Sequence, residues 1–254
     1  MRLLENKCGM VVGATSGIGR AAALLFAKEG AKVAVIGRRT KLLKELCTEI
    51  EGEGGIAITI TADVTKTKEV ARMVAEAKSA FGKLDFAFNN AGTIGNFVPM
   101  LEQSEQDWDK TLDTNLKSIW LSVREQAKAM KNGGAIVNTS SWLALGGLIG
   151  STTYSASKAG MDGLLRPAAL ELAEMGIRIN NINPGGVDTE MTREAFQYNE
   201  ETLDHFSKSH PIGRMGSPVE IADLAAFLIS DRASNITGQA IVIDGGYTIA
   251  GQRS

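Results

Sequence analysis

Short apolar runs recur along the chain and alternate with longer amphipathic segments. The runs are rich in Val, Ile and Phe and occupy residues 9–13, 32–37, 56–61, 84–89, 134–140, 177–183 and 240–244. Most are continuously apolar rather than alternating, which is typical of strands that are covered on both faces. The pattern therefore predicts seven buried, parallel β-strands.

The segments between these runs carry apolar residues at helical spacing. Residues 18–30 and 67–82 are the clearest examples, and the first of them ends at a glycine that can cap a helix. Regular alternation of strands and helices predicts an α/β fold with helices on both faces of a parallel sheet. No internal repeat or linker interrupts the alternation, so we predict one domain over residues 1–254.

One segment departs from this rhythm. Residues 188–216 have mixed polarity and separate two strand signals. A long insertion after the carboxyl end of a strand is suited to a substrate lid, although a purely structural helical excursion is the alternative.

Composition excludes several classes of protein. The 254 residues are 44% hydrophobic and 22% charged, with a formal net charge of -2, so the chain offers no basic surface for nucleic acid. No apolar run has the length of a membrane span, and the first residues are too few and too charged for a signal peptide. We expect a cytoplasmic protein without a nucleic-acid or membrane partner.

Cysteine and histidine are scarce. Cys8 and Cys47 lack metal-ligand spacing and are interpreted as small, reduced core residues. With only His205 and His210 present, a histidine metal site or a Ser/His/Asp triad has little support. We predict no metal centre.

Three glycines lie between the first strand and the first helix. Gly13, Gly17 and Gly19 permit a tight turn and bring backbone N–H groups to the positive end of that helix. This placement predicts a binding site for the diphosphate of a dinucleotide.

The end of the second strand bears on which dinucleotide is bound. Sites that prefer NAD usually carry Asp or Glu there, whereas this chain has Arg38 and Arg39 after Gly37. Guanidinium groups match phosphate well, so the sequence favours NADP(H), with NAD(H) as the alternative. The alternative interpretation is structural: the two arginines are solvated residues at the start of the next helix and bind no cofactor.

Further motifs follow the predicted strands in a fixed order. They are Asp63–Val64, Asn89–Gly92, Thr114–Asn115, Ser140–Ser141, YSASK at Tyr154–Lys158, NPGGVDT at Asn183–Thr189, and the segments 210–222 and 235–246. With these motifs at these spacings, the chain resembles the short-chain dehydrogenase/reductase family over residues 6–247. It is similar to the 3-oxoacyl-carrier-protein reductases and related ketone reductases of comparable length.

The resemblance implies an architecture and a set of site residues. It implies a single Rossmann-like, doubly wound sheet of seven strands in the order 3-2-1-4-5-6-7, and a homotetramer paired through the helices after strands 4 and 5. The implied catalytic residues are Asn115, Ser141, Tyr154 and Lys158. The implied cofactor-binding residues are Gly13, Thr15, Ser16, Gly17, Ile18, Gly19, Arg38, Arg39, Asp63, Val64, Asn90, Ala91, Gly92, Tyr154, Lys158, Pro184, Gly185, Val187 and Thr189.

Three departures from the family pattern qualify these expectations. Val12 replaces the Thr that usually opens the glycine motif, and Pro167 falls inside the helix of Tyr154, where it should affect packing more than chemistry. Asn132 and Met175 replace basic residues that are frequent in carrier-protein reductases, which disfavours an acyl-carrier-protein substrate.

The spacing of Tyr154 and Lys158 favours proton transfer. The two residues are one helical turn apart, so their side chains share a face. A cation about 4 Å from a phenol contributes about 4 kcal/mol at an effective dielectric of 20, roughly three pKa units. We therefore expect Lys158 to lower the pKa of Tyr154 towards neutrality. Ser141 can donate to the substrate oxygen, and by resemblance Asn115 holds a water linked to Lys158.

The residues after Ser141 are apolar and predict the substrate side of the site. Ordinary core packing is the alternative for these residues. The predicted pocket consists of Trp142, Leu143, Leu148, Met191 and Phe196, with Phe97 nearby.

These features predict an oxidoreductase that uses NADP(H) to interconvert an apolar, small-molecule ketone and a secondary alcohol. The alternatives are a 3-oxoacyl-carrier-protein reductase and an NAD-dependent secondary alcohol dehydrogenase. An enoyl reductase fits less well because that relative spaces its Tyr and Lys by seven residues. A halohydrin lyase would lack the glycines and Lys158, and a nucleotide-sensing regulator would typically lose Tyr154 or Lys158.

Overall fold

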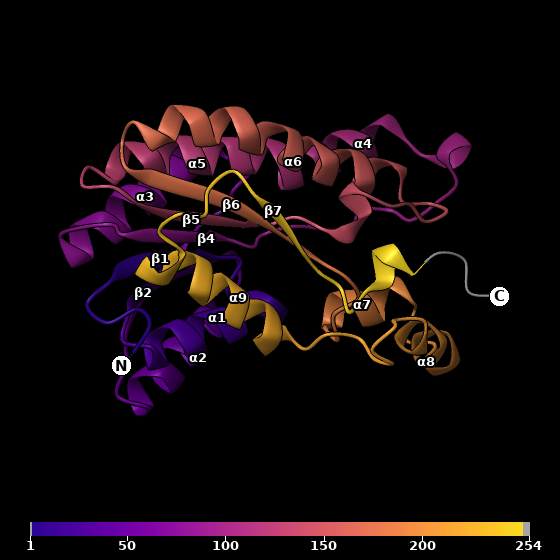
Figure 1. The fold of residues 1–254 in the computed structure, drawn as a ribbon, viewed down its shortest axis with the longest axis horizontal. Helices are drawn as coiled ribbons and strands as arrows, with labels where there is room; N and C mark the ends of the chain where they lie inside the picture. Colours follow the sequence, from indigo (N-terminus) through magenta and orange to yellow (C-terminus); the bar gives the residue numbers. More distant parts are fainter. Residues whose placement is uncertain (1, 251–254) are drawn as a thin grey trace.

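The computed structural model describes residues 2–250 and contains one sheet of seven parallel strands (Figure 1). Residues 1 and 251–254 of the predicted domain lie outside the described part. The strand order is β3-β2-β1-β4-β5-β6-β7, which confirms the predicted topology. The strands are β1 Cys8–Val12, β2 Lys32–Gly37, β3 Ile56–Thr61, β4 Phe86–Asn89, β5 Gly134–Thr139, β6 Ile177–Pro184 and β7 Ala240–Ile243.

Helices cover both faces of the sheet. In Figure 1, α1, α2 and α9 lie on one side, and α3, α4, α5 and α6 lie on the other. The helices are α1 Gly17–Lys28, α2 Thr40–Gly52, α3 Thr67–Phe81, α4 Glu105–Leu112, α5 Ser118–Ala129, α6 Thr152–Ala173, α7 Glu190–Ala195, α8 Glu200–Lys208 and α9 Pro218–Ile229. The doubly wound α/β fold is therefore confirmed.

Two separate cores hold the helices on the sheet, one on each face. On the α1 and α9 face, the ring of Phe26 packs edge-on against Phe86 at 5.6 Å and Phe88 at 5.9 Å between ring centroids. Gly9 leaves room for this stack, since a side chain there would collide with the Phe86 ring. Each fully buried aromatic ring contributes about 1.5–3 kcal/mol relative to an exposed one.

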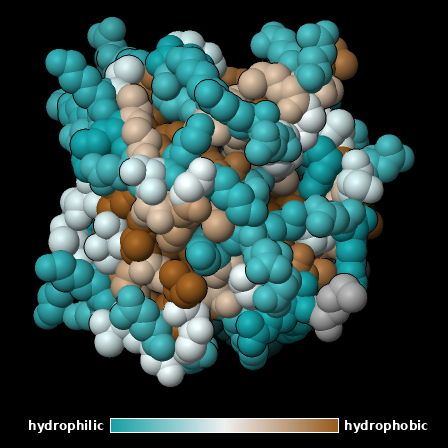
Figure 2. Space-filling model, turned by 90° about the vertical axis from the view of Figure 1, so that its left-hand side faces the viewer, coloured by the Kyte–Doolittle hydropathy of each residue, from teal (hydrophilic) through white to brown (hydrophobic). Residues whose placement is uncertain are grey.

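The sheet order reverses between β2 and β4, which pair with opposite sides of β1. Crossovers therefore leave in opposite directions and open a crevice beyond the carboxyl ends of these strands. The opposite face, at the amino ends, has hydrophilic residues around a more hydrophobic middle (Figure 2). Because the crevice lies at the carboxyl ends of the strands, a ligand-binding site is expected there.

Three local details refine the sequence predictions. The fourth strand begins at Phe86, two residues later than predicted. Helix α6 continues through Pro167, although proline cannot donate the helical hydrogen bond to the carbonyl of Gly163. Residues 188–216 contain two short helices, α7 and α8.

Candidate active site

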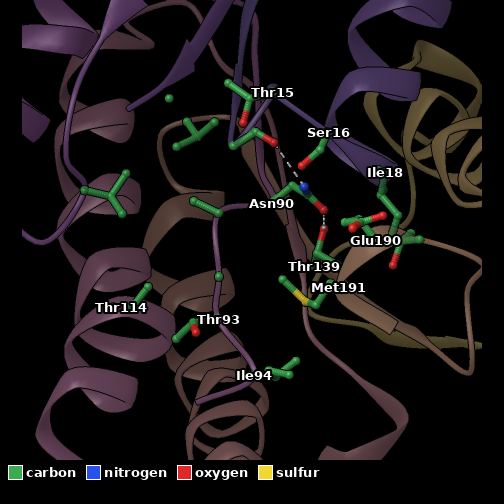
Figure 3. Close-up of a pocket in the computed structure, with 18 of the residues that line it drawn as sticks. Thr15, Ser16, Ile18, Asn90, Thr93, Ile94, Thr114, Thr139, Glu190 and Met191 are labelled. Atoms are coloured by element: carbon green, nitrogen blue, oxygen red, sulfur yellow. Dashed lines mark hydrogen bonds between the residues drawn. The ribbon is translucent and has the colours of Figure 1, made fainter. Parts of the chain in front are cut away.

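A cavity of about 470 Å³ opens at the carboxyl ends of the strands. Its wall is built from the loop after β1, the ends of β2 to β6, the start of α6, and α7 (Figure 3). Segments far apart in the sequence meet here because all strands are parallel and end at the same edge of the sheet.

The glycine loop forms one end of this cavity. Gly13 has a φ of +85°, and a Cβ there would lie 2.6 Å from the backbone nitrogen of Ala91. A Cβ on Gly19 would collide with the carbonyl oxygen of Gly13, so this residue allows α1 to approach the loop. Gly13 and Gly17 line the cavity, whereas Gly19 supports it from behind. A backbone cradle of this kind, at the N-terminus of α1, fits the diphosphate of a dinucleotide.

Asn90 fastens the glycine loop to the neighbouring strand ends. Its Nδ2 donates to the carbonyl oxygen of Gly13 at 3.4 Å, and its Oδ1 accepts from the Thr139 hydroxyl at 3.0 Å (Figure 3). The side chain predicted from the family motif thus lies in the wall and also stabilises the loop.

The two arginines lie at the cavity edge after β2. Arg39 donates from Nη2 to the hydroxyls of Thr15 at 2.5 Å and Ser16 at 2.8 Å. Arg38 lies near Asp63: burial acts to raise the pKa of Asp63, but hydrogen bonds from Thr65 and the charge of Arg38 lower it overall. Cationic groups therefore stand where an NAD-preferring site usually has a carboxylate.

Ser141, Tyr154 and Lys158 share the middle of the cavity wall. Ser141 is the second residue after the end of β5, while Tyr154 and Lys158 lie in the first turns of α6. The Lys158 amino group donates to the carbonyl oxygen of Thr139 at 2.7 Å and lies 5.6 Å from the centroid of the Tyr154 ring. The structure thus brings the predicted hydroxyls and amine to one place.

Burial dominates the protonation of this pair. It lowers the pKa of Lys158 from 10.5 to about 8, although the charge of Asp162 acts in the other direction. Burial also raises the pKa of Tyr154, and a hydrogen bond with Ser141 only partly opposes this change. This direction differs from the predicted lowering by Lys158, because the loss of hydration around the phenolate raises the pKa of Tyr154 more than the hydrogen bond with Ser141 lowers it.

Asn115 lies behind the wall rather than in it. It is buried in a π-helical turn, Asp113–Lys117, between α4 and α5. Its side chain accepts from the backbone nitrogen of Thr93 and donates to the carbonyl of the same residue, both at 2.8 Å. A third hydrogen bond, at 3.1 Å, reaches the hydroxyl of Ser157 on α6. Asn115 therefore fastens the loop after β4 to the helix of Tyr154 and Lys158.

The apolar substrate wall predicted from the sequence is mostly not formed by the predicted residues. Met191 lines the cavity, but Trp142, Leu143, Leu148 and Phe196 do not. Trp142 is 8% exposed and packs edge-on against Tyr247 at 4.7 Å, and Phe196 packs on Phe206 at 4.9 Å.

Trp142 and Phe196 pack elsewhere because α8 and the C-terminal segment place the rings of Phe206 and Tyr247 beside them. Leu148 is 40% exposed and lies outside the wall. Phe97, in contrast, lies 6.2 Å from the Tyr154 ring, measured between ring centroids.

Several wall residues were not predicted. They lie at the end of β5, within five residues after β4 or β5, or on α7, positions that a topology-based search could have flagged. The main ones are Thr93, Ile94, Thr139, Ser140, Glu190, Thr192 and Glu194.

Two further classes of site find no support among residues 2–250. No group of three or more His, Cys, Asp or Glu side chains in this part could hold a metal ion. No helix in the same range is both long and apolar enough to span a bilayer.

Comparisons with known proteins identify the family of this chain. Residues 13–248 match a family model described as enoyl-(acyl carrier protein) reductase. The chain is 40% identical to a cyclohexanol dehydrogenase of Acinetobacter sp. (strain SE19) over 246 residues, covering 96% of each protein. It is 38% identical to a 3-oxoacyl-acyl-carrier-protein reductase of Staphylococcus epidermidis, covering 95% of this chain and 98% of the relative.

Solved structures show the same relationship. A 7α-hydroxysteroid dehydrogenase complexed with NADH and 7-oxo glycochenodeoxycholic acid has a TM-score of 0.90 and 33% identity, covering 96% of this chain and 94% of the other. The chain belongs to the short-chain dehydrogenase/reductase family. It is an oxidoreductase of the kind that acts on alcohol and ketone groups with a nicotinamide cofactor.

Proposed function

We propose that the protein reversibly reduces a ketone to a secondary alcohol with NADP(H), and that Tyr154 is the general acid and base. The observation that carries this proposal is the position of Ser141, Tyr154 and Lys158 in the same cavity wall as the glycine loop. A dinucleotide on the loop would extend towards the tyrosine, and the nicotinamide would supply or accept the hydride.

Each residue of the wall has a defined task in this proposal. The Tyr154 hydroxyl gives its proton to the ketone oxygen during reduction and takes it back during oxidation. Ser141 donates a hydrogen bond to the same oxygen and stabilises the charge that develops there. Lys158 favours the charged form of Tyr154, and Asn115 fixes the loop and helix that carry the site.

The raised pKa of Tyr154 predicts how the rates of reduction and oxidation depend on pH. A tyrosine that stays protonated at neutral pH is ready to donate a proton, which suits ketone reduction. Alcohol oxidation needs the deprotonated form, so its rate should rise with pH until Tyr154 is ionised. Oxidation that was fastest below neutral pH would contradict this role.

NADP(H) is favoured over NAD(H) by the arginines after β2. Arg39 already lies on Thr15 and Ser16 of the glycine loop, where it could contact a 2′-phosphate, and Gly37, Arg38, Arg39 and Thr40 offer no carboxylate to a ribose hydroxyl. We expect Arg39→Ala to raise the KM for NADPH about tenfold or more and to leave the KM for NADH little changed, because only NADPH carries the 2′-phosphate. Arg232→Ala, which removes an arginine far along the sequence near the end of α9, is the matched control. An intrinsic preference for NADH would favour the NAD-dependent alternative.

A neutral, apolar ketone is the favoured substrate class. Ile94 and Met191 line the cavity, and Phe97 packs near Tyr154. The relative named for cyclohexanol acts on a neutral cyclic alcohol. Glu190 and Glu194 of α7 also line the cavity and would repel the acidic surface of an acyl carrier protein.

The decisive experiment is a panel of cyclic, aliphatic and acetoacetyl-thioester substrates, each measured with NADPH and with NADH. We expect the highest kcat/KM for a neutral ketone with NADPH. Turnover of the thioester far above that of every simple ketone would instead favour a 3-oxoacyl-carrier-protein reductase.

Three further features are part of the proposal. Residues 188–216 act as a lid, which the cavity-lining positions on α7 support. The protein forms a homotetramer, and exposed Trp120 on α5 and Leu170 on α6 are suited to helix pairing between subunits. It is located in the cytoplasm, in keeping with two free, buried cysteines.

A further inference from the structure

A chain of buried amides crosses three strands beneath the candidate site. Asn89 of β4 donates to Asn138 of β5 at 2.9 Å, and Asn138 donates to Asn181 of β6 at 2.9 Å. Asn181 then donates to Oδ1 of Asp162 on α6 at 2.8 Å. Every N–H bond in this chain points the same way, towards Asp162.

The second carboxylate oxygen of Asp162 is also occupied. Its Oδ2 accepts from the Nδ2 of Asn183 at 2.7 Å. An ionised carboxylate only accepts hydrogen bonds, so two buried amide donors are matched to the anionic form. Asn183 directly precedes Pro184 and Gly185, which belong to the cavity wall.

Asp162 follows Lys158 by one helical turn, so the two side chains share a face of α6. The Lys158 side chain is only 5% exposed, and burial works against its charge. The charge of Asp162 is the one that opposes this effect.

The remaining charged groups around the cavity stand on other elements. They are Arg38, Arg39 and Asp63 after β2 and β3, and Glu190 and Glu194 on α7. Among the described residues, no carboxylate forms an ion pair with Lys158 within 4.0 Å, and the centroid of the Tyr154 ring lies 5.6 Å from the amino group.

The offset between Asp162 and Lys158 has a chemical advantage. A direct ion pair would occupy an N–H donor of the amino group and draw it away from the cavity. In the structure, Lys158 uses a donor on the Thr139 carbonyl, and Asp162 supplies a compensating negative charge from one turn away. A second N–H contacts the Met161 sulfur at 3.8 Å, so the third donor remains for the cavity, whose wall includes Lys158.

We propose that Asp162 is a positioning residue that keeps Lys158 charged inside the buried site, with the amide chain from Asn89 holding its carboxylate in place. This inference rests on the proposed function of Lys158. The effect of Asp162 on the charge of the Lys158 amino group can nevertheless be measured without turnover.

The test is the titration of the Lys158 amino group by NMR in protein labelled at lysine, with Lys158→Met used to assign the signal. In the wild-type protein without nucleotide, we expect the midpoint near pH 8. In Asp162→Asn, loss of the unit charge one helical turn away should lower the midpoint by about one to two pH units. Glu171→Gln removes an exposed carboxylate from the same helix and should leave the midpoint unchanged.

Kinetics provide the second measurement. At pH 8, we expect Asp162→Asn to lower kcat about tenfold while the KM for the ketone stays within about twofold, because the lysine loses its charge at a lower pH. The fall in kcat should be smaller at pH 6.

An unchanged Lys158 midpoint in folded Asp162→Asn would overturn the inference, even if the wild-type enzyme reduces ketones. A shifted midpoint supports it, even if no ketone is reduced, in which case only the proposed function fails. If Asp162→Asn does not fold, Asp162→Ser removes the same charge and keeps an oxygen that can accept from the buried amides. The same downward shift is then expected, and its absence would overturn the inference.

Discussion

The two ends of the cavity were predictable to very different degrees. The nucleotide end is formed by backbone turns at strand ends, and Gly13, Gly17 and Asn90 lie there as the motifs predict. At the ketone end, Met191 lines the wall but Trp142 and Phe196 pack into an aromatic cluster instead. Backbone requirements are visible in a sequence because few residues satisfy them, whereas an apolar side chain satisfies a core and a pocket equally well.

The largest expected effect tests the residue where the two ends meet. Tyr154→Phe removes the proton donor but retains the ring, so we expect kcat for ketone reduction to fall about 10²–10⁴-fold. Tyr247→Phe, in which the ring remains in the aromatic cluster, should keep kcat within about twofold. Steady-state assays of purified, folded variants measure both effects. Unchanged reduction by Tyr154→Phe across the substrate panel would remove Tyr154 from the mechanism.

The second prediction separates packing from substrate contact at the ketone end. Trp142→Ala should lower the free energy of unfolding by about 3–5 kcal/mol, because it empties a buried aromatic site. Met191→Ala should cost less than about 1 kcal/mol, since Met191 is exposed, but it should change the ratio of kcat/KM between large and small ketones. Chemical denaturation and the ketone panel measure these outcomes. If Trp142→Ala is as stable as the wild type and instead changes the preference among ketones, Trp142 contacts the substrate and the contrast between the two ends is wrong.

The third prediction tests the backbone cradle. Gly19→Ala places a Cβ against the carbonyl of Gly13, so it should destabilise the fold by about 1–3 kcal/mol and weaken NADPH binding at least tenfold. Gly147→Ala is the matched control, because a Cβ there meets no atom within 4 Å. Fluorescence titration with NADPH and thermal unfolding report the two quantities. Normal NADPH affinity in Gly19→Ala would show that the loop tolerates a side chain.

The smallest effect concerns the buried charge of Lys158. Because the folded-state pKa is lowered to about 8, the unfolded chain binds the proton more tightly, and wild-type stability should rise between about pH 8 and 10.5. Below pH 8, burial of the charged Lys158 lowers the free energy of unfolding by its full amount, about 3 kcal/mol. Loss of the Thr139 hydrogen bond costs about 1 kcal/mol, so Lys158→Met should be about 2 kcal/mol more stable at pH 7.

Denaturation curves across this pH range measure the prediction. Lys158→Met should lack the rise in stability, while Lys68→Met, at an exposed position of α3, should retain it. Equal pH dependence in wild type and Lys158→Met would contradict the burial argument.

The protonation of the site shows another limit of sequence reasoning. The one-turn spacing of Tyr154 and Lys158 correctly placed both side chains in one wall, but it gave the wrong direction for the pKa of Tyr154. Spacing reveals which charges are neighbours along a helix. It does not reveal how much water the rest of the fold removes from them.

The sequence by itself determined the alternation of strands and helices, the glycine turn and the residues that follow each strand, because period, turn chemistry and strand ends are local properties. The strand order, which the structure confirms, came from the family resemblance. Only the tertiary structure decided which apolar residues face the cavity, how deeply Lys158 is buried, and that Asn89, Asn138 and Asn181 join across strands to reach Asp162. Those properties depend on neighbours from distant parts of the chain. A linear pattern carries no record of them until packing brings the strands together.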